Sequence, residues 1–218
     1  MLKLSLLLVI LTGCSVGPTN LRSSYVSDLE ARKIRRIAVL PPTMTAGAPA
    51  PKVPFDNAPD SRTSEREAPA NVARFAYSAL AALPNWQIVS ESEVREVSQS
   101  LAANSTENRI QQIGSAVYAD AVLTSRVQRY RERVGNAWGA QSPASVAFVL
   151  NLVDVRRGDV VWSATFDETQ KPLSENIFAF GDIGERGVRW LSADQLAQDG
   201  VKKAIGQLYR LIVRGPPS

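Results

Sequence analysis

Apolar residues recur along this chain with two different spacings. Between residues 67 and 83 they stand three or four positions apart, which is the stripe of an amphipathic helix. Residues 34–40 and 145–155 are short runs of Ile, Val, Ala, Leu and Phe, which is typical of strands. The two patterns together predict strands at 34–40, 86–89, 121–134, 145–155 and 160–166, and helices at 67–83, 90–101, 106–117 and 192–212.

Polar residues mark the ends of several of these elements. Ser90 and Glu93 have the spacing of a capping box, and so do Ser192 and Gln195, so each pair predicts the start of a helix. The sequence Arg-Arg-Gly-Asp at 156–159 separates two apolar runs. It therefore predicts an antiparallel hairpin.

The expected order of elements is β-α-β-α-α-β-β-β-α. Helices between the early strands imply parallel pairing, whereas the consecutive late strands imply an antiparallel meander. We therefore expect an α/β fold in which helices pack on one mixed β-sheet. A chain of 218 residues can bury one substantial core but leaves little room for a second domain.

Two segments follow neither spacing. Residues 43–66 are rich in Pro, Ala, Asp and Ser, and residues 167–191 are unusually apolar for a loop. Loops of this length in a compact domain are either functional or disordered. Both follow expected strands, where recognition loops commonly lie.

The amino terminus has the order of a secretory signal. Lys3 is followed by an apolar run over 4–11 and then by Leu-Thr-Gly-Cys, ending at Cys14. The run is too short for a transmembrane helix, which needs about twenty residues. Leu-Thr-Gly-Cys matches the lipobox of bacterial lipoproteins, so we expect Cys14 to carry the acyl (palmitate-type) anchor. The residue after the cysteine is Ser15 and not Asp. In this the chain resembles Gram-negative lipoproteins that are sent to the outer membrane, with the polypeptide in the periplasm.

This reading divides the chain into four parts. Residues 1–13 form the signal peptide, and the polar residues 14–33 form a lipidated tether. Residues 34–213 form a single periplasmic α/β domain, and residues 214–218 form a tail.

The amino-acid composition excludes several kinds of catalytic and metal-binding site. The chain has no His and one Cys, which leaves no disulfide, no Cys/His zinc site and no His-based nucleophilic triad. No spacing of acidic residues matches a metal-ligand loop, and no glycine-rich phosphate loop is present. The net charge of +4 is too small to imply nucleic-acid binding. We expect no enzyme activity, no cofactor and no bound metal. Asp120 and Asp154 are interpreted as capping or turn residues.

Four short motifs carry a resemblance to a known group. The motifs are Ile-Ala-Val-Leu-Pro at 37–41, Ala-Asp-Ala-Val-Leu-Thr at 119–124, Arg-Glu-Arg at 131–133 and Gly-Asp-Val-Val-Trp at 158–162. With these motifs the chain resembles the anticodon-binding-domain-like α/β fold of periplasmic proteins, as in the amino-terminal domain of the Tol translocation protein TolB, the lipoprotein activators of penicillin-binding proteins and the curli secretion lipoprotein CsgG. The motifs are signatures of a fold rather than of a catalytic site.

Arginines in one strand form the first candidate binding site. Simple alternation puts Arg129, Arg131 and Arg133 on one face and Arg126 on the other. One interpretation is a charged edge strand that discourages aggregation. The other is a face that binds lipopolysaccharide phosphates, peptidoglycan carboxylates or an acidic partner, because guanidinium groups suit oxyanions.

Apolar residues in the second irregular segment form the other candidate. Ile177, Phe178, Phe180 and Trp190 either fold over the sheet as core or form an exposed partner-binding patch.

These features favour a membrane-anchored periplasmic lipoprotein that acts as a non-enzymatic binding or assembly factor of the cell envelope. Its expected partners are the membrane, through Cys14, and an envelope protein, with self-association left open. The alternative is a subunit of an oligomeric outer-membrane secretion channel, which would need membrane-crossing hairpins and ring assembly.

Overall fold

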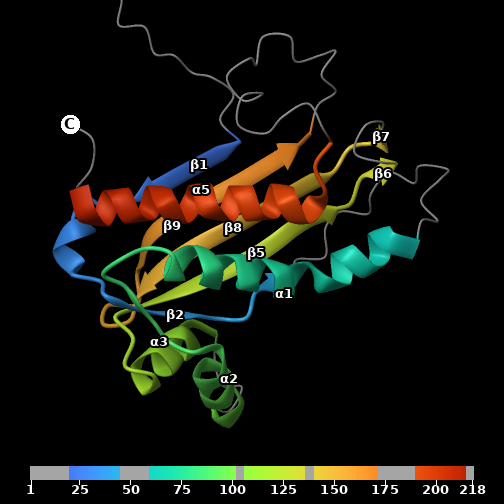
Figure 1. The fold of residues 1–218 in the computed structure, drawn as a ribbon. Helices are drawn as coiled ribbons and strands as arrows, with labels where there is room; N and C mark the ends of the chain where they lie inside the picture. Colours follow the sequence, from blue (N-terminus) through green and yellow to red (C-terminus); the bar gives the residue numbers. More distant parts are fainter. Residues whose placement is uncertain (1–19, 45–58, 102–105, 136–139, 171–189, 215–218) are drawn as a thin grey trace, which may run out of the picture.

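Helices pack against a seven-stranded mixed sheet in the order expected from the sequence (Figure 1). The computed structural model describes residues 20–44, 59–101, 106–135, 140–170 and 190–214. The sheet contains β1 (Leu21–Tyr25), β2 (Arg36–Val39), β3 (Thr43–Met44), β4 (Gln87–Ile88), β5 (Ala121–Arg131), β8 (Ser145–Asp154) and β9 (Val160–Thr169). The helices are α1 (Pro59–Ala81), α2 (Glu91–Ser100), α3 (Thr106–Ala116) and α5 (Ala193–Arg214).

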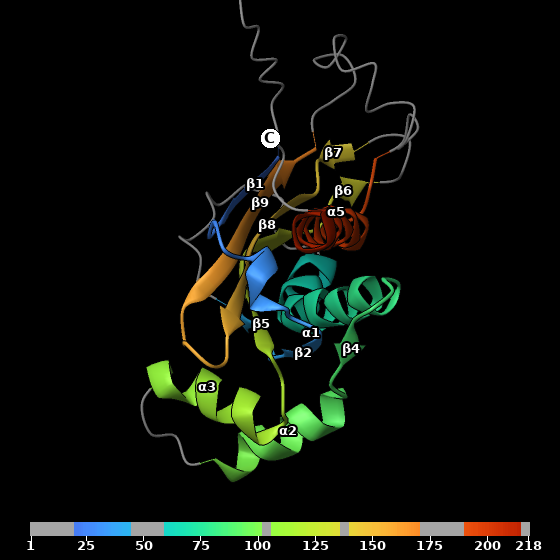
Figure 2. The same ribbon diagram turned by 90° about the vertical axis from the view of Figure 1, so that its left-hand side faces the viewer.

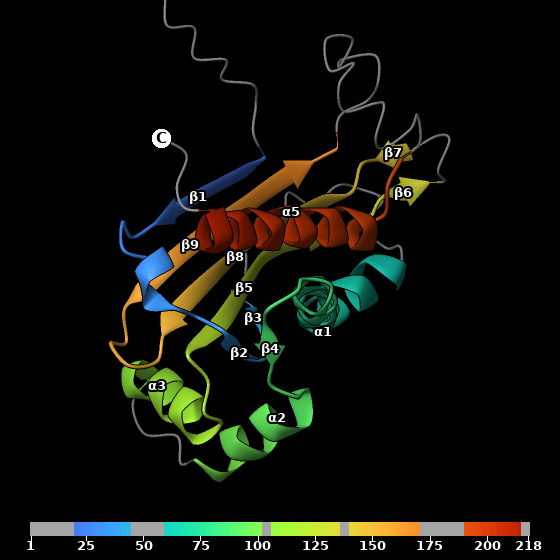
Figure 3. The same cartoon turned by 60° about the vertical axis from the view of Figure 1, so that its left-hand side comes forward.

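Strand pairing in the sheet changes from antiparallel to parallel at β5. Its strand order is β1-β9-β8-β5-β2-β4, with β3 also pairing with β5. The pairs β2–β4, β2–β5 and β3–β5 are parallel, whereas β5–β8, β8–β9 and β9–β1 are antiparallel. The fold class predicted from the sequence, including parallel early strands and an antiparallel late meander, is confirmed. A separate ribbon of β6 (Val134–Gly135) and β7 (Ala140–Ser142) lies at the opposite end of the sheet from α2 and α3 (Figure 3).

The main core lies between one face of the sheet and the helices α1 and α5 (Figure 2). Trp162 from β9 is fully buried there, and the rings of Phe148 and Phe166 stack with centroids 5.0 Å apart. A Cβ atom on Gly200 would lie 2.8 Å from Phe166 Cδ1, so α5 approaches the sheet closely at this point. Within the described ranges, no helix combines the length and apolar character needed to cross a bilayer.

A smaller core lies at one end of the other face. Helices α2 and α3 bury Val94 and Ile113 there against Ala38, Val122 and other strand residues. These two helices cover the sheet only near the start of β5, as Figure 2 shows. The rest of this face carries no helix in the described part of the chain.

The predicted helix starts and the predicted turn are confirmed. The Ser192 side chain accepts a hydrogen bond from Gln195 N at 3.2 Å, and Ser192 N donates to the Gln195 side chain at 3.0 Å, which is the expected capping box. Ser90 caps α2 by accepting from Glu93 N at 3.3 Å. Gly158, with φ of +76°, occupies the turn between β8 and β9, where a side chain would be strained.

The expected tether is shorter than its sequence suggests. Residues 21–25 form β1 and pair with β9, and residues 30–32 form a 3₁₀ turn, so the prediction of a tether through residue 33 is wrong for this part. The segment is polar because β1 is an edge strand with one face open to solvent, which hides the usual strand pattern. The lipidation residue Cys14 lies outside the described residues.

Parts of the two irregular segments also belong to helices and strands. Within 43–66, Thr43 and Met44 pair with β5, and α1 begins at Pro59 rather than at residue 67. Within 167–191, β9 continues to Thr169, and residues 190–191 lead into α5. Residues 45–58 and 171–189 lie outside the described residues.

Candidate functional site: an open arginine-bearing face of the sheet

A β-bulge in β5 brings three arginines to one face of the sheet. Arg126 pairs with Val149, and Arg129 pairs with Ala147, so Gln128 is an extra residue in β5. Partners two positions apart on β8 point to the same face. Arg126 and Arg129 therefore share a face, and the prediction that Arg126 points to the opposite side is wrong. Arg131, opposite Ser145, continues the same row.

Neighbouring strands extend this face with small polar side chains. Residues directly opposite each other in antiparallel strands point to the same side, so the register defines the surface. The face, called here the open face, consists of Arg22, Ser24, Thr124, Arg126, Arg129, Arg131, Ser145, Ala147, Val149, Asn151, Ser163, Thr165, Asp167 and Thr169. Arg22, Ser24, Arg126 and Thr165 are exposed, in keeping with the absence of a described helix over them.

The arginines of the open face differ in how they are held. Arg129 Nε donates to Ser145 Oγ at 2.7 Å, and its guanidinium pairs with Asp167. Arg22, Arg126 and Arg131 make no ion pair with a described carboxylate. The open face therefore carries four guanidinium groups against the one carboxylate of Asp167, and it has the charge to attract an anionic surface.

Arg133 leaves this row and stabilises the start of α5. Arg133 Nη1 donates to the backbone oxygen of Trp190 at 3.0 Å, and the Glu132 carboxylate accepts from Ala193 N at 3.0 Å. Trp190 is half-buried, next to the buried Leu191. The structure thus places Arg133 with Trp190, away from Arg129 and Arg131. The other predicted partner residues, Ile177, Phe178 and Phe180, lie outside the described residues and stay a prediction.

The carboxylates considered for chemistry have structural roles. Asp120 accepts from the backbone amides of Arg35 and Arg36 at 2.9 and 2.8 Å, which fixes the start of β2. Asp154 accepts from the amides of Arg156 and Arg157 in the hairpin turn. The interpretation of Asp120 and Asp154 as capping and turn residues is confirmed. Among the described residues, no cluster of three or more potential metal ligands occurs.

Tyr130 joins the end of β5 to both long helices. Its hydroxyl donates to Asp194 in the first turn of α5, and Asn71 of α1 donates to the same carboxylate oxygen at 3.0 Å. Burial, followed by the hydrogen bond to Asp194, raises the pKa of Tyr130 well above its ordinary value. This network is polar but partnered, so it orients the helices rather than offering a reactive group.

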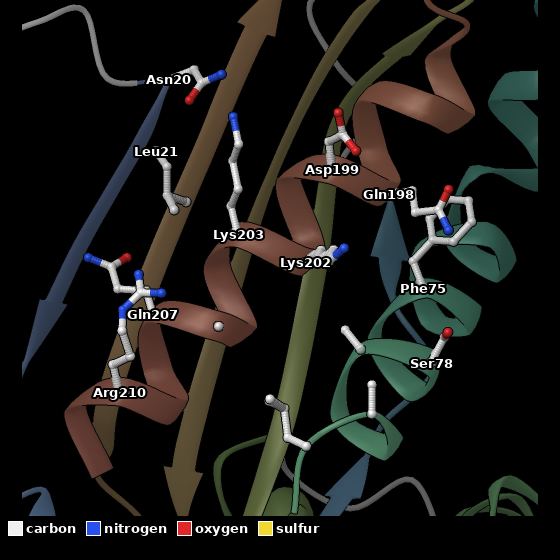
Figure 4. Close-up of a pocket in the computed structure, with 14 residues that line it drawn as sticks. Asn20, Leu21, Phe75, Ser78, Gln198, Asp199, Lys202, Lys203, Gln207 and Arg210 are labelled. Carbon is white, nitrogen blue, oxygen red and sulfur yellow. The ribbon is translucent and has the colours of Figure 1, made fainter. Parts of the chain in front are cut away.

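A groove, which the sequence did not indicate, runs along the outer side of α1 and α5 (Figure 4). It has a volume of roughly 990 Å³ and extends to the start of β1. Phe75 and Ala79 of α1, Leu83 just after it, and Lys202, Lys203 and Gln207 of α5 contribute to its wall. The helical stripe in the sequence placed these polar α5 residues away from the core, but only the packing of α1 beside α5 makes a groove.

Three solved structures resemble this chain at low sequence identity. A PelC dodecamer from Paraburkholderia phytofirmans is 17% identical with a TM-score of 0.46, over 86% of this chain and 95% of that chain. Lipoprotein GNA1162 from Neisseria meningitidis is 18% identical with a TM-score of 0.39, over 69% and 91%. The LpoB C-terminal domain from Escherichia coli is 16% identical with a TM-score of 0.39, over 62% and 83%. At these identities the likeness concerns the fold alone. No protein-family model and no curated protein matches the chain.

Proposed function

We propose that this chain is an outer-membrane lipoprotein, anchored through Cys14 and facing the periplasm, that binds or helps to assemble a cell-envelope complex without being an enzyme. The anchor rests on the signal and the Leu-Thr-Gly-Cys motif that ends at Cys14. The binding role rests on the geometry of the sheet.

The single observation that carries the binding role is the open face. Arg22, Arg126 and Arg131 stand on it without a described carboxylate partner, and the side chains around them are mainly Ser, Thr and Asn. The sheet fixes the spacing of the strand positions that carry these guanidinium groups, and guanidinium groups suit bidentate contacts with carboxylates, so a carboxylate-bearing partner surface fits this face. We therefore propose an acidic envelope protein as the partner.

A binding role also fits the side chains available for catalysis. The chain has no His, and its one Cys is the expected lipidation residue. Asp120 and Asp154 are already engaged with backbone amides, so neither is free to act as a general base.

Cross-linking in intact cells tests the proposal. A photo-cross-linking amino acid at Thr165, which is exposed on the open face, is expected to capture a protein in the envelope. The matched control has the same amino acid at Gln198, which is exposed on α5 on the other side of the sheet. Capture from Gln198 alone would contradict the proposal.

Charge removal provides the second arm of the test. Replacing Arg22, Arg126 and Arg131 with Gln is expected to abolish capture from Thr165. The control replaces three exposed basic residues elsewhere, Arg74, Lys202 and Arg210, with Gln, so that both proteins lose the same charge. Equal loss of capture in the two proteins would show that net charge, and not the open face, is responsible.

A further inference from the structure

No described strand pairs with the outer edge of β1. β1 ends the strand order of the main sheet and, among the described strands, pairs with β9 alone. Asp167 N donates to Asn20 O at 2.9 Å, and Val26 N donates to Val161 O at 3.0 Å. Because antiparallel hydrogen bonds alternate along a strand, Leu21, Ser23 and Tyr25 direct their backbone N–H and C=O groups away from β9.

This edge lacks the usual protection against pairing. Natural edge strands are commonly guarded by proline, by a bulge, by inward-pointing charge or by being very short. β1 contains no proline, its register with β9 is regular over five residues, and its one charged residue, Arg22, points to the open face. The opposite edge of the sheet, β4, has only two residues.

We propose that β1 pairs antiparallel with β1 of a second copy of this chain, about a two-fold axis at Ser23. This register uses the whole strand and joins residues whose backbone groups point outward: Ser23 faces Ser23 of the second copy, and Leu21 faces Tyr25. It also sets Arg22 opposite Ser24, whereas a two-fold axis at Arg22 would set the two Arg22 side chains opposite each other, which is unfavourable.

Side-chain exposure agrees with this arrangement. The Tyr25 side chain is 40% exposed, so part of its ring is open to a second chain. In the paired strands, Tyr25 of one copy lies beside Leu21 of the other, on the side of the sheet that faces α5. Leu21 lines the groove of Figure 4, with Lys203 and Gln207 of α5 near it, so the tyrosine ring would cover this end of the groove.

Anchoring in a membrane raises the local concentration of the chain, and such a small interface needs a high concentration to form. Five paired residues bury less surface than the roughly 1,200 Å² typical of stable complexes, so two free chains associate weakly. Cys14 precedes Leu21 by only a short segment, so anchored copies hold their β1 strands in one plane near the membrane surface. This last step rests on the proposed lipid anchor, whereas the pairing itself does not.

Cysteine cross-linking of the full-length, membrane-attached protein tests the pairing. Cys14 is the one native cysteine, so Ser23→Cys adds a single thiol when Cys14 is acylated. Diamide oxidation is expected to give a disulfide-linked dimer, because facing residues have Cα atoms about 5.5 Å apart. The matched control is Ser24→Cys, which is more exposed but would lie about 8 Å from its counterpart, too far for a disulfide.

Each result has a definite meaning. A dimer from Ser23→Cys with little from Ser24→Cys supports the pairing. Equal amounts of dimer from the two variants would show that the disulfide forms by random collision, which overturns the proposal. A cross-link to a different protein would show that another strand occupies the edge, which also overturns it. In a Cys14→Ser protein, dimer from Ser23→Cys should persist at high protein concentration, so a failed anchor and a failed pairing give different results.

A proline substitution tests whether backbone hydrogen bonds hold the dimer. In the Ser23→Cys protein, Tyr25→Pro removes an N–H that points away from β9 and is expected to reduce cross-linking several-fold. Tyr25→Ala removes the ring but keeps the N–H, so it should retain most of the cross-linking. Thermal unfolding of both variants is the control: melting temperatures close to that of the Ser23→Cys protein would show that β1 still pairs with β9. Equal cross-linking by the Pro and Ala variants would overturn strand pairing as the mode of association.

Discussion

Arg32 and Asp154 form a buried ion pair, with 3.1 Å between Arg32 Nη1 and Asp154 Oδ2, although they stand 122 positions apart in the chain. The Arg32 side chain is 5% exposed and also pairs with Asp28 and Asp159. These charge-assisted hydrogen bonds, Asp159 first and Asp28 next, raise the pKa of Arg32 above its ordinary value. The cluster fastens the segment after β1 to the β8–β9 turn, and so positions the amino-terminal edge of the sheet.

Arg32→Met is expected to lower the melting temperature because it leaves the buried carboxylate of Asp154 without its cationic partner. Arg157→Met is the matched control, since it removes an exposed ion pair to the same Asp28. Circular dichroism during heating measures both. Equal, small losses in the two variants would show that the Arg32 cluster does not stabilise the fold.

Gly200→Ala is expected to destabilise the protein by about 1–3 kcal/mol, the usual cost of overpacking a core. The added Cβ would lie 2.8 Å from the buried ring of Phe166, which is stacked on Phe148 and has little room to move. Gly206→Ala on the same helix is the control, because its added Cβ would meet only Arg210 Nη1, at 3.9 Å. Denaturant unfolding compares the two variants, and a more stable Gly200→Ala protein would contradict this packing.

Alkaline pH is expected to weaken the fold through Tyr77. Burial, and then the negative charge of Glu91, raise the pKa of Tyr77 to about 12. The unfolded chain releases this proton near pH 10, so the stabilisation is complete below pH 10 and is lost as pH rises from 10 toward 12. Tyr77→Phe should therefore show a smaller fall in melting temperature between pH 8 and pH 11 than the unmodified protein. An identical fall in melting temperature in both proteins would contradict the raised pKa of Tyr77.

Cys14→Ser is expected to abolish acyl labelling and to release the protein from membranes. The reason is that acyl chains at Cys14 are the proposed anchor, and multiple chains hold a protein far more firmly than one. Membrane fractionation after a high-salt wash measures the effect. If the substituted protein stayed in the membrane fraction, a second anchor would have to exist.

Much of the fold could be predicted because helix and strand spacings are local properties of the sequence. The apolar stripe of α5 and the capping pair of Ser192 and Gln195 require only neighbouring residues, and both are found in the structure. α1 begins earlier than predicted, at Pro59, since a stretch rich in Pro, Ser and charged residues reads as a loop. Proline at a first helical position fits the helix, because its missing N–H would have no partner there.

The sequence by itself determined the order of the main helices and strands, the mixed sheet and the proposed lipidation residue, since each depends on residues close together in the chain. Only the tertiary structure decided that residues 21–25 form an edge strand, because their hydrogen-bond partners come from β9. It alone placed the bulge at Gln128, because register is set by pairing with β8 and one extra residue reverses every later side chain. The open face and the outer edge of β1 follow from these distant pairings, which no local pattern in the sequence records.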